Sequence, residues 1–404
     1  MGAPPFALFA KGGTQRSPSQ LCNNHTVTVL SLRVLPSSRD APFAYDTRSD
    51  DTRNMTIVAM IAVPLSLGAL AAIQALLARR DRLRFPPPGR IVEGLHVRAL
   101  GAGTPAIVFE SGIAASCLSW NVIQTQLAAV GATYSYDRSG YGWSAAGNGG
   151  CSLEKITRDL HGLLDALHVP RPFLFIGHSF GGFIARYYVH RYPEEVAGLV
   201  LVDPVTPEEW QSPSLAQRRR LRRAIFFTRA AGVLACFGMV RLGLWVLLRR
   251  GNGNPGPLLG LSDTMRRVAA EVGKLARPAD SARLAVEGSL GTSATTGAPA
   301  PAVFDVVSRL RARWSVPGFF WTMASYISAL PTCAAQVASC ALPAHLPLTV
   351  LSGAHQPPER LAEHAAISTR HLIAGASAHW IHLDQPDLVI EAIHEVAGRV
   401  AGLT

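Results

Sequence analysis

The chain has 404 residues, enough for one large α/β domain with additions or for two domains. Hydrophobic residues make up 48% and charged residues 16%, a composition that suits a globular protein with a membrane-facing part, and the net charge of +11 leaves nucleic acid and an anionic lipid surface as candidate partners. The six cysteines include no C-x-x-C pair and no zinc-ligand spacing, which excludes a structural zinc module and favours buried thiols. A Cys333–Cys340 disulfide would require an oxidising compartment.

The first 54 residues carry no signal of a folded unit. Residues 1–54 are rich in Pro, Ser, Asn and Asp and show no sustained periodicity. We expect either a disordered N-terminus or a gene start placed too early, since Met55 would open a coherent protein of its own.

An uncharged apolar run follows, from Met55 to Ala78. It is long enough for a transmembrane helix, and a buried helix is the alternative. A secretory signal peptide would have a shorter apolar core and a small-residue cleavage site. Four arginines between Arg79 and Arg84 follow the run, whereas only Arg48 and Arg53 lie just before it. This bias predicts a single-pass anchor with the rest of the chain in the cytoplasm.

Strand and helix patterns then alternate from residue 85 to residue 205. Strands or hairpins are expected at 91–100, 104–110, 133–136, 173–176 and 196–202, and helices at 121–130, after Ser152 and after Phe183. Such alternation predicts a mostly parallel sheet covered by helices on both faces. Chemistry in such sheets gathers at the carboxyl ends of the strands, where Gly112, Asp137, Ser179 and Asp203 fall.

The alternation stops between residues 206 and 344 and resumes over 345–404, with strands at 346–351 and 370–374 and a final helix from Pro386. We therefore expect residues 206–344 to be an insertion in one domain.

From Ser212 to Ser262 the insertion has no Asp or Glu, and arginines alternate with bulky apolar residues. This pattern fits a helix in a lipid interface, or an ordinary helix with its arginines in water, and it disfavours nucleic acid. Arg241 argues against a second membrane span at 230–248, and residues 287–302 predict a floppy loop.

The stretch Gly177-His178-Ser179-Phe180-Gly181 lies between the strand at 173–176 and a helical pattern. This is the context of a nucleophile elbow, in which glycines allow a sharp turn and the serine hydroxyl is raised above the sheet edge. The alternative is a plain glycine-rich turn, because G-x-S-x-G alone is a weak motif.

Four stretches in the same order give the chain its resemblance to a known family. They are Glu110-Ser-Gly-Ile113, Asp137-Arg-Ser-Gly-Tyr-Gly-Trp-Ser144, Gly177-His-Ser-Phe-Gly181 and Ser377-Ala-His-Trp-Ile-His-Leu-Asp-Gln-Pro386. In this the chain resembles the α/β-hydrolase superfamily, over roughly residues 90–205 and 345–404. The resemblance implies an α/β-hydrolase fold whose insertion is a helical cap, with the core formed by 85–205 and 345–404.

The resemblance also implies roles for single residues. His379 matches the catalytic histidine, with His382 as the nearby competitor, and His178 is expected to pack beside the nucleophile. The triad acid usually follows the strand that ends here at Gly353, but no carboxylate occurs there before Glu359. Asp203 is the first candidate, because some members of the superfamily supply the acid from that position, and Glu359 or Glu363 is the alternative.

An oxyanion hole requires two donors. The backbone N–H of Phe180, directly after the nucleophile, is one, and the resemblance implies the N–H of Ile113 as the other. Asp137 and Arg138 are interpreted as a structural pair that braces the Gly140–Gly142 loop.

The sequence therefore predicts a membrane-anchored serine hydrolase that acts on a small apolar ester, with an amide as second choice, and that needs no metal or organic cofactor. Dehalogenases and epoxide hydrolases of the superfamily have aspartate where this chain has Ser179. The alternatives are a ligand-binding protein that has lost turnover, and an acyltransferase or C–C bond hydrolase with the same triad. The sequence leaves the oligomeric state open.

Overall fold

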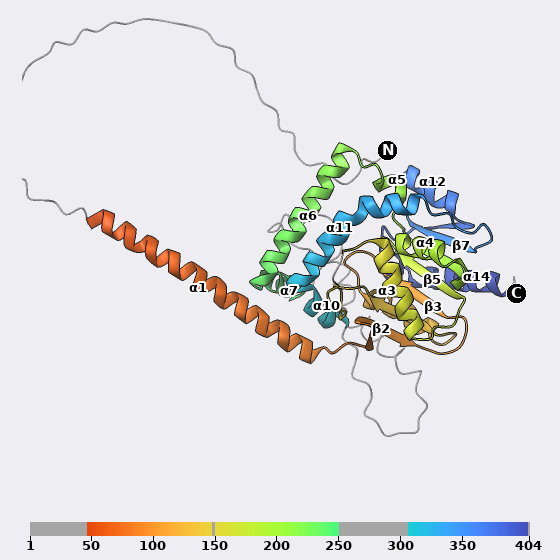
Figure 1. The fold of residues 1–404 in the computed structure, drawn as a ribbon, viewed down its shortest axis with the longest axis horizontal. Coiled ribbons are helices and arrows are strands. Elements are labelled where there is room, and N and C mark those ends of the chain that lie inside the picture. Colours follow the sequence, from red (N-terminus) through yellow and green to blue (C-terminus); the bar gives the residue numbers. More distant parts are fainter. Residues whose placement is uncertain (1–46, 148–149, 250–305, 403–404) are drawn as a thin grey trace, which may run out of the picture. The chain divides into compact units, whose positions relative to one another are not determined.

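The computed structural model describes residues 47–147, 150–249 and 306–402, so the prediction for the loop at 287–302 lies outside the described residues. The prediction of a disordered segment over 1–54 lies outside them for residues 1–46 and is wrong for residues 47–54, which belong to helix α1 because the helix continues upstream of the apolar run. The chain divides into two compact units, Met1–Ser66 and Leu67–Thr404. Helix α1 (Thr47–Arg84) contains the apolar run and is drawn as one long helix in Figure 1. Within the described ranges, it is the single unbent helix that is long and apolar enough to cross a membrane.

The centre of the second unit is an eight-stranded sheet with the order β1-β2-β4-β3-β5-β6-β7-β8. The strands are β1 (Arg90–Val92), β2 (Leu95–Leu100), β3 (Ile107–Glu110), β4 (Thr133–Asp137), β5 (Phe173–His178), β6 (Val196–Val202), β7 (Leu348–Gly353) and β8 (Arg370–Ala374). The β1–β2 hairpin joins β4 antiparallel, and every later pairing is parallel. This is the mostly parallel sheet that the alternating patterns predict.

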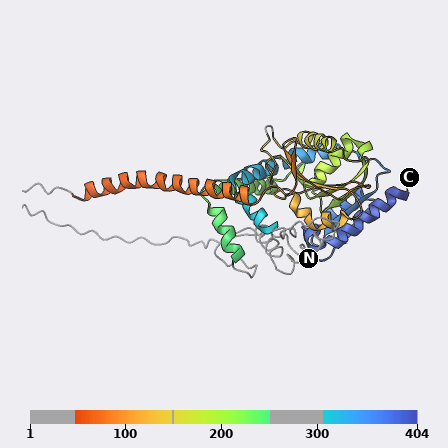
Figure 2. The same cartoon turned by 90° about the horizontal axis from the view of Figure 1, so that it is seen from below.

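Helices cover both faces of the sheet, because alternate residues of the buried strands point to opposite sides. Phe173 and Phe175 of β5 pack with α3 (Leu153–Ala166) and α4 (Gly181–Arg191). Leu174 and Ile176 pack on the other face with α2 (Asn121–Leu127) and α14 (Pro386–Gly402). Figure 2 shows helices on both sides of the strands. The predicted cap of α3 is confirmed, since the Ser152 side chain accepts a hydrogen bond from the Lys155 N–H.

The chain between β6 and β7 forms a group of helices, α5 (Pro207–Trp210), α6 (Leu215–Cys236), α7 (Met239–Arg249), α10 (Val306–Trp314) and α11 (Pro317–Ala338). Residues of α11, among them Tyr326 and Leu330, share a buried cluster with Phe180 and Phe183 at the start of α4. This group of helices therefore covers the sheet beside the elbow.

The remaining elements are short. They are α12 (Pro358–Ile367), α13 (Ile381–Asp384) and the 3₁₀ turns Cys117–Trp120 and Pro193–Glu195. Cys333 and Cys340 are both free thiols, so the disulfide considered from sequence does not form in this structure.

Candidate active site

Ser179 lies in the turn between β5 and α4 with a left-handed backbone, φ +54°. Such a conformation is strained for a residue with a Cβ and is typical of functional sites. The turn is so tight that a Cβ on Gly177 would lie 2.8 Å from the Gly181 carbonyl oxygen, and one on Gly181 would lie 2.6 Å from the Glu110 carbonyl oxygen. Ser179 is half-buried, and its hydroxyl makes no hydrogen bond to any residue that the structure describes.

His379 follows β8 and makes a hydrogen bond to Asp203, which follows β6. The distance from His379 Nδ1 to Asp203 Oδ2 is 2.5 Å. The Asp203 side chain is completely buried, whereas 37% of the His379 side chain is exposed. Because an ionised carboxylate can only accept, Nδ1 donates the proton of this hydrogen bond, and Nε2 is the ring nitrogen that Asp203 does not bind. Asp203 and His379 are therefore arranged as the acid and base of a triad require.

Three further groups act on the Asp203 carboxylate. The Gly353 N–H donates to Oδ1 at 3.1 Å, and the Gln356 side-chain amide donates to both oxygens, at 2.9 and 2.8 Å. Burial alone would raise the pKa of Asp203, but the hydrogen bond and charge of His379, the charge of Arg360 and the Gly353 N–H lower it below the ordinary value. The aspartate is therefore ionised at neutral pH.

Gln356 lies in the loop after β7, where the sequence has no carboxylate before Glu359. The residue there is an amide that binds the carboxylate of Asp203 and does not itself carry the charge. Within the described ranges, neither Glu359 nor Glu363 makes a hydrogen bond or an ion pair with His379. Sequence periodicity could not reveal Gln356, because its partner is distant along the chain.

His178, the last residue of β5, directly precedes Ser179 and contacts the loop after β8 that carries His379. Its Nε2 donates to the His379 carbonyl oxygen at 3.0 Å, and the two rings have centroids 4.8 Å apart. His379 is thus held beside the residue that precedes Ser179, although no hydrogen bond joins Ser179 and His379 among the described residues. Burial, with His382 and His379 nearby, lowers the pKa of His178 well below its usual value, so His178 is neutral.

His382 is placed differently from His379. It is buried and packs between the rings of Trp120 and His178, at centroid distances of 4.5 and 4.3 Å. Neither ring nitrogen has a hydrogen-bond partner among the described residues, and burial lowers its pKa to about 3. With no carboxylate to orient it, His382 lacks what a general base requires.

The predicted oxyanion donors lie in two loops that meet at Gly112. A Cβ on Gly112 would lie 2.9 Å from His178 Nδ1 and 3.2 Å from Ser179 Cβ, so the loop after β3 passes directly beside the elbow. The N–H groups of Ile113 and Phe180 donate to no backbone carbonyl of the described chain. Both are therefore available to an added acceptor.

Arg138 holds the loop that contains Ile113. It forms a buried ion pair with Glu110 and donates to the carbonyl oxygens of Ser111 and Gly112, the latter at 2.7 Å. The Gly112 carbonyl and the Ile113 N–H belong to one trans peptide and point in opposite directions. By binding the carbonyl, Arg138 directs the N–H away from itself.

The interpretation of Asp137 and Arg138 as one structural pair is wrong. Asp137 is the last residue of β4 and Arg138 follows it, and the two side chains have separate partners. Asp137 accepts from His96 at 2.7 Å and from the Cys117 and Trp143 N–H groups, and it fills the space where a Cβ on Gly142 would lie. Asp137 braces the glycine loop, while Arg138 supports the loop after β3.

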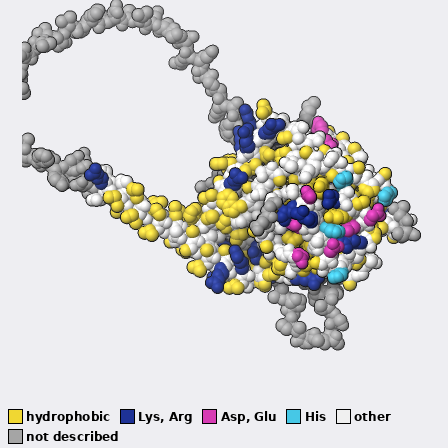
Figure 3. Space-filling model, viewed as in Figure 1, with side chains coloured by type: hydrophobic (Ala, Val, Ile, Leu, Met, Phe, Trp, Pro, Cys, Tyr) yellow, Lys and Arg dark blue, Asp and Glu magenta, His cyan; other side chains and the backbone are white. Residues whose placement is uncertain are grey.

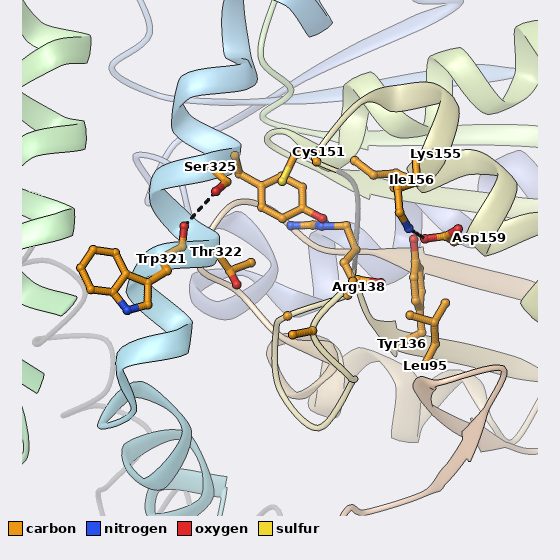
Figure 4. A pocket seen from close by; sticks show the side chains of 16 residues that line it. Leu95, Tyr136, Arg138, Cys151, Lys155, Ile156, Asp159, Trp321, Thr322 and Ser325 are labelled. Atoms are coloured by element: carbon orange, nitrogen blue, oxygen red, sulfur yellow. Dashed lines mark hydrogen bonds and ion pairs between the residues drawn. The ribbon is translucent and has the colours of Figure 1, made fainter. Parts of the chain in front are cut away.

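A pocket of about 190 Å³ lies beside Arg138, and its lining does not include Ser179, Asp203 or His379. Figure 4 shows Arg138 in this pocket between Tyr136 on β4 and Thr322 on α11. Its lining is mixed, with Lys155 paired to Asp159 and Arg138 already paired to Glu110. The pocket is therefore separate from the candidate triad.

One group of potential metal ligands occurs in the described ranges, formed by His96, Cys117 and Asp137. His96 Nδ1 and Asp137 Oδ2 are 2.7 Å apart, which is a hydrogen-bond distance. Two such atoms on one tetrahedral zinc would be about 3.3 Å apart, as zinc–ligand bonds near 2 Å require. Burial raises the pKa of Cys117 well above the ordinary value, so it is a thiol. These residues fit a hydrogen-bonded brace better than a zinc site.

Comparison with known proteins agrees with this fold. A family model described as alpha/beta hydrolase fold matches residues 105–231. An AB hydrolase superfamily protein of Gibberella zeae is 33% identical over 103 residues, which are 24% of this chain and 32% of that protein. The uncharacterized protein YqjL of Bacillus subtilis is 29% identical over 104 residues, which are 26% of this chain and 41% of YqjL. The chain thus spans less than half the length of these relatives. A thermophilic esterase from Thermogutta terrifontis has the same fold, with a TM-score of 0.50, 19% identity, and coverage of 76% of this chain and 93% of the esterase.

Proposed function

The chain belongs to the α/β-hydrolase superfamily, and on that basis we propose that it is a membrane-anchored serine hydrolase that cleaves an ester of an apolar substrate. The observation that carries the proposal is the hydrogen bond between His379 Nδ1 and the buried Asp203 carboxylate. A protein that only bound ligands would have no use for an imidazole oriented by an ionised aspartate beside a strained serine.

In the proposed reaction, Ser179 Oγ attacks the ester carbonyl carbon while His379 Nε2 takes the hydroxyl proton. The N–H groups of Ile113 and Phe180 stabilise the oxyanion, and Asp203 stabilises the imidazolium. Collapse of the intermediate breaks the ester C–O bond, and His379 returns the proton to the leaving alcohol. Water then attacks the acyl-enzyme by the same route and releases the acid and free Ser179.

The membrane part of the proposal is supported by α1, whose side chains Met55, Val58 and Leu65 are among many apolar ones exposed. Arginines follow the apolar run at its C-terminal end, which supports a cytoplasmic catalytic domain. Extraction with alkaline carbonate tests the anchor, since a spanning protein stays in the pellet. Protease digestion of sealed membranes tests which side carries the catalytic domain.

The chemical test is replacement of Ser179 by alanine. We expect Ser179→Ala to lose at least about a thousandfold in kcat on short p-nitrophenyl esters, and to lose labelling by a fluorophosphonate probe. Ser339→Ala, an exposed serine at the end of α11, is the matched control and should keep both. Unchanged hydrolysis by Ser179→Ala would refute the assignment, and product analysis would show whether water or another acceptor takes the acyl group.

A further inference from the structure

Helix α6 has an arginine-rich first half and a mainly apolar second half, in which the exposed Arg229 is the one charged residue. Its first half carries the exposed arginines Arg219, Arg222 and Arg223, and α6 contains no Asp or Glu. Its second half carries Phe226 and Phe227, with exposed fractions of 66% and 65%, followed by Val233 and Leu234. Figure 3 shows the Lys and Arg side chains gathered toward the N-terminal end of α6. Neighbouring exposed aromatic and aliphatic side chains form a contiguous apolar patch, and such patches mark interaction surfaces.

The apolar surface continues past the end of α6. At Gly238 the chain turns by 96° into α7, where Met239 and Leu242 are about half exposed. The apolar half of α6, from Phe226 to Cys236, is about 16 Å long, half the thickness of a bilayer's hydrocarbon core. The apolar half of α6 is too short to span alone. Helices α6 and α7 are together long and apolar enough to enter a membrane, and their 96° bend suits shallow insertion. We call residues 226–242 the α6–α7 elbow.

The α6–α7 elbow is held against the last turns of α1. Arg241 donates to the Gln74 side chain at 2.9 Å and forms an ion pair with Asp81, and Gln74 itself is buried and donates to the Ser315 carbonyl at 2.7 Å. A Cβ on Gly238 would lie 3.5 Å from Gln74 Oε1. Gln74 precedes Ala78, where the apolar run ends, by four residues, or about 6 Å along the helix. The elbow therefore lies level with the end of the apolar run of α1.

We propose that the α6–α7 elbow inserts into the leaflet at the C-terminal end of α1, with Arg219, Arg222 and Arg223 at anionic lipid headgroups. The depth to which the α6–α7 elbow inserts rests on the proposed function, because it assumes that α1 spans the bilayer. Arginine beside exposed aromatic and aliphatic side chains matches an anionic lipid surface. Arg241 does not oppose insertion, because Asp81 neutralises it. The exposed Arg229 carries its charge at the end of a long side chain, which can extend to the headgroups while its methylene groups stay in the apolar layer. Helix α6 packs on α11, and α11 covers the turn that carries Ser179. The docked α6 would therefore hold the candidate active site close to an apolar substrate in the lipid.

The test places a photoreactive benzoylphenylalanine at Phe227 or at Leu234 in the full chain, reconstituted into vesicles of phosphatidylcholine with or without phosphatidylglycerol. The matched control carries the same group at Ile373, an apolar residue on β8 that is 57% exposed. Mass spectrometry then counts lipid adducts at each position. Alkaline carbonate extraction of the same samples reports separately whether α1 anchors the chain.

We expect several-fold more lipid adduct at positions 227 and 234 than at 373. The excess should fall several-fold without phosphatidylglycerol, and equally in an Arg219→Gln, Arg222→Gln, Arg223→Gln variant. Adduct yields no higher than at position 373, or crosslinks to a second copy of the chain in place of lipid, would overturn the proposal. Release by carbonate would refute the α1 anchor alone, and the adduct yields would still decide for or against the docking surface.

Discussion

Asp203 and His379 are 176 residues apart in the chain, yet Asp203 Oδ2 and His379 Nδ1 lie 2.5 Å from each other. The contact exists because β6, β7 and β8 are neighbours in the sheet, with Val202 paired to Leu351 and Gly353 paired to Ala374. The loops that follow these strands therefore meet at one edge. The buried, ionised aspartate binds Nδ1 and leaves Nε2 as the nitrogen for the proposed role of base.

The first prediction concerns this pair. Asp203→Asn keeps the size of the side chain but removes the charge that stabilises the imidazolium, so we expect kcat to fall by about 10⁴ with little change in KM. The measurement is the steady-state rate on a p-nitrophenyl ester. Glu359→Gln and Glu363→Gln are the controls, because both glutamates were alternatives for the acid, and a larger loss in either would reverse the assignment.

A second prediction concerns Arg138 as a positioning residue. Arg138→Lys keeps a positive charge beside Glu110 but cannot also reach the Gly112 carbonyl in the same fork-like manner. We expect kcat to fall by about ten- to a hundredfold at constant KM, because the proposed oxyanion donor at Ile113 is no longer held. The rate of fluorophosphonate labelling should fall in parallel, whereas a purely structural role would lower the free energy of unfolding alone.

The Arg138–Glu110 pair also predicts a stability effect. Arg138→Met leaves the buried Glu110 carboxylate without its cation and should destabilise the fold by about 3–5 kcal/mol. The double variant Glu110→Gln, Arg138→Met removes both charges and should be more stable than the single variant. Urea unfolding compares the two, and equal stability would contradict a coupled pair.

Gly112 provides a steric test of the oxyanion loop. In Gly112→Ala the new methyl group would lie 2.9 Å from His178 Nδ1 and 3.2 Å from Ser179 Cβ, so the loop must move. A shift of about 1 Å at a reacting centre costs roughly a hundredfold in rate. Gly162→Ala in α3 is the control, since its Cβ meets nothing within 4 Å, and it should keep full activity. An active Gly112→Ala would place the oxyanion donors elsewhere.

Buried histidines predict a loss of stability in acid. Burial lowers the pKa of His382 to about 3 and that of His364 to about 4, and the pKa of His178 lies well below 6.5. Below pH 6.5 the unfolded chain binds protons that the folded chain does not, so the free energy of unfolding falls as pH falls toward the folded pKa values. His382 alone should cost about 2 kcal/mol between pH 6.5 and pH 5.

Urea unfolding at pH 7.5 and pH 5 measures this pH dependence. His382→Phe should reduce the difference in stability between the two pH values, because the residue that must stay neutral in the fold is gone. His394→Gln, which replaces an exposed histidine of α14, should leave the difference unchanged. An unaltered difference in His382→Phe would mean that other groups cause the acid sensitivity.

Local patterns in the sequence were sufficient for the elements themselves. The strand before Gly177, the cap at Ser152 and the start of the last helix at Pro386 all lie where the periodicity and the capping residues predict them. The same is true of the serine turn, because only glycines tolerate its close backbone contacts. These features depend on residues within a few positions of each other, and the sequence by itself determined them.

Tertiary structure decided the partners of the charged and polar side chains. From sequence alone Asp203, Glu359 and Glu363 were all candidates for the carboxylate, and Asp137 and Arg138 looked like one unit. The order of the strands brings Asp203 to His379, and at the end of β4 Asp137 turns toward His96 while Arg138 turns toward Glu110. The physical reason is that hydrogen bonds and ion pairs act through space over about 3 Å, and the distance along the chain between two partners leaves no mark in local composition.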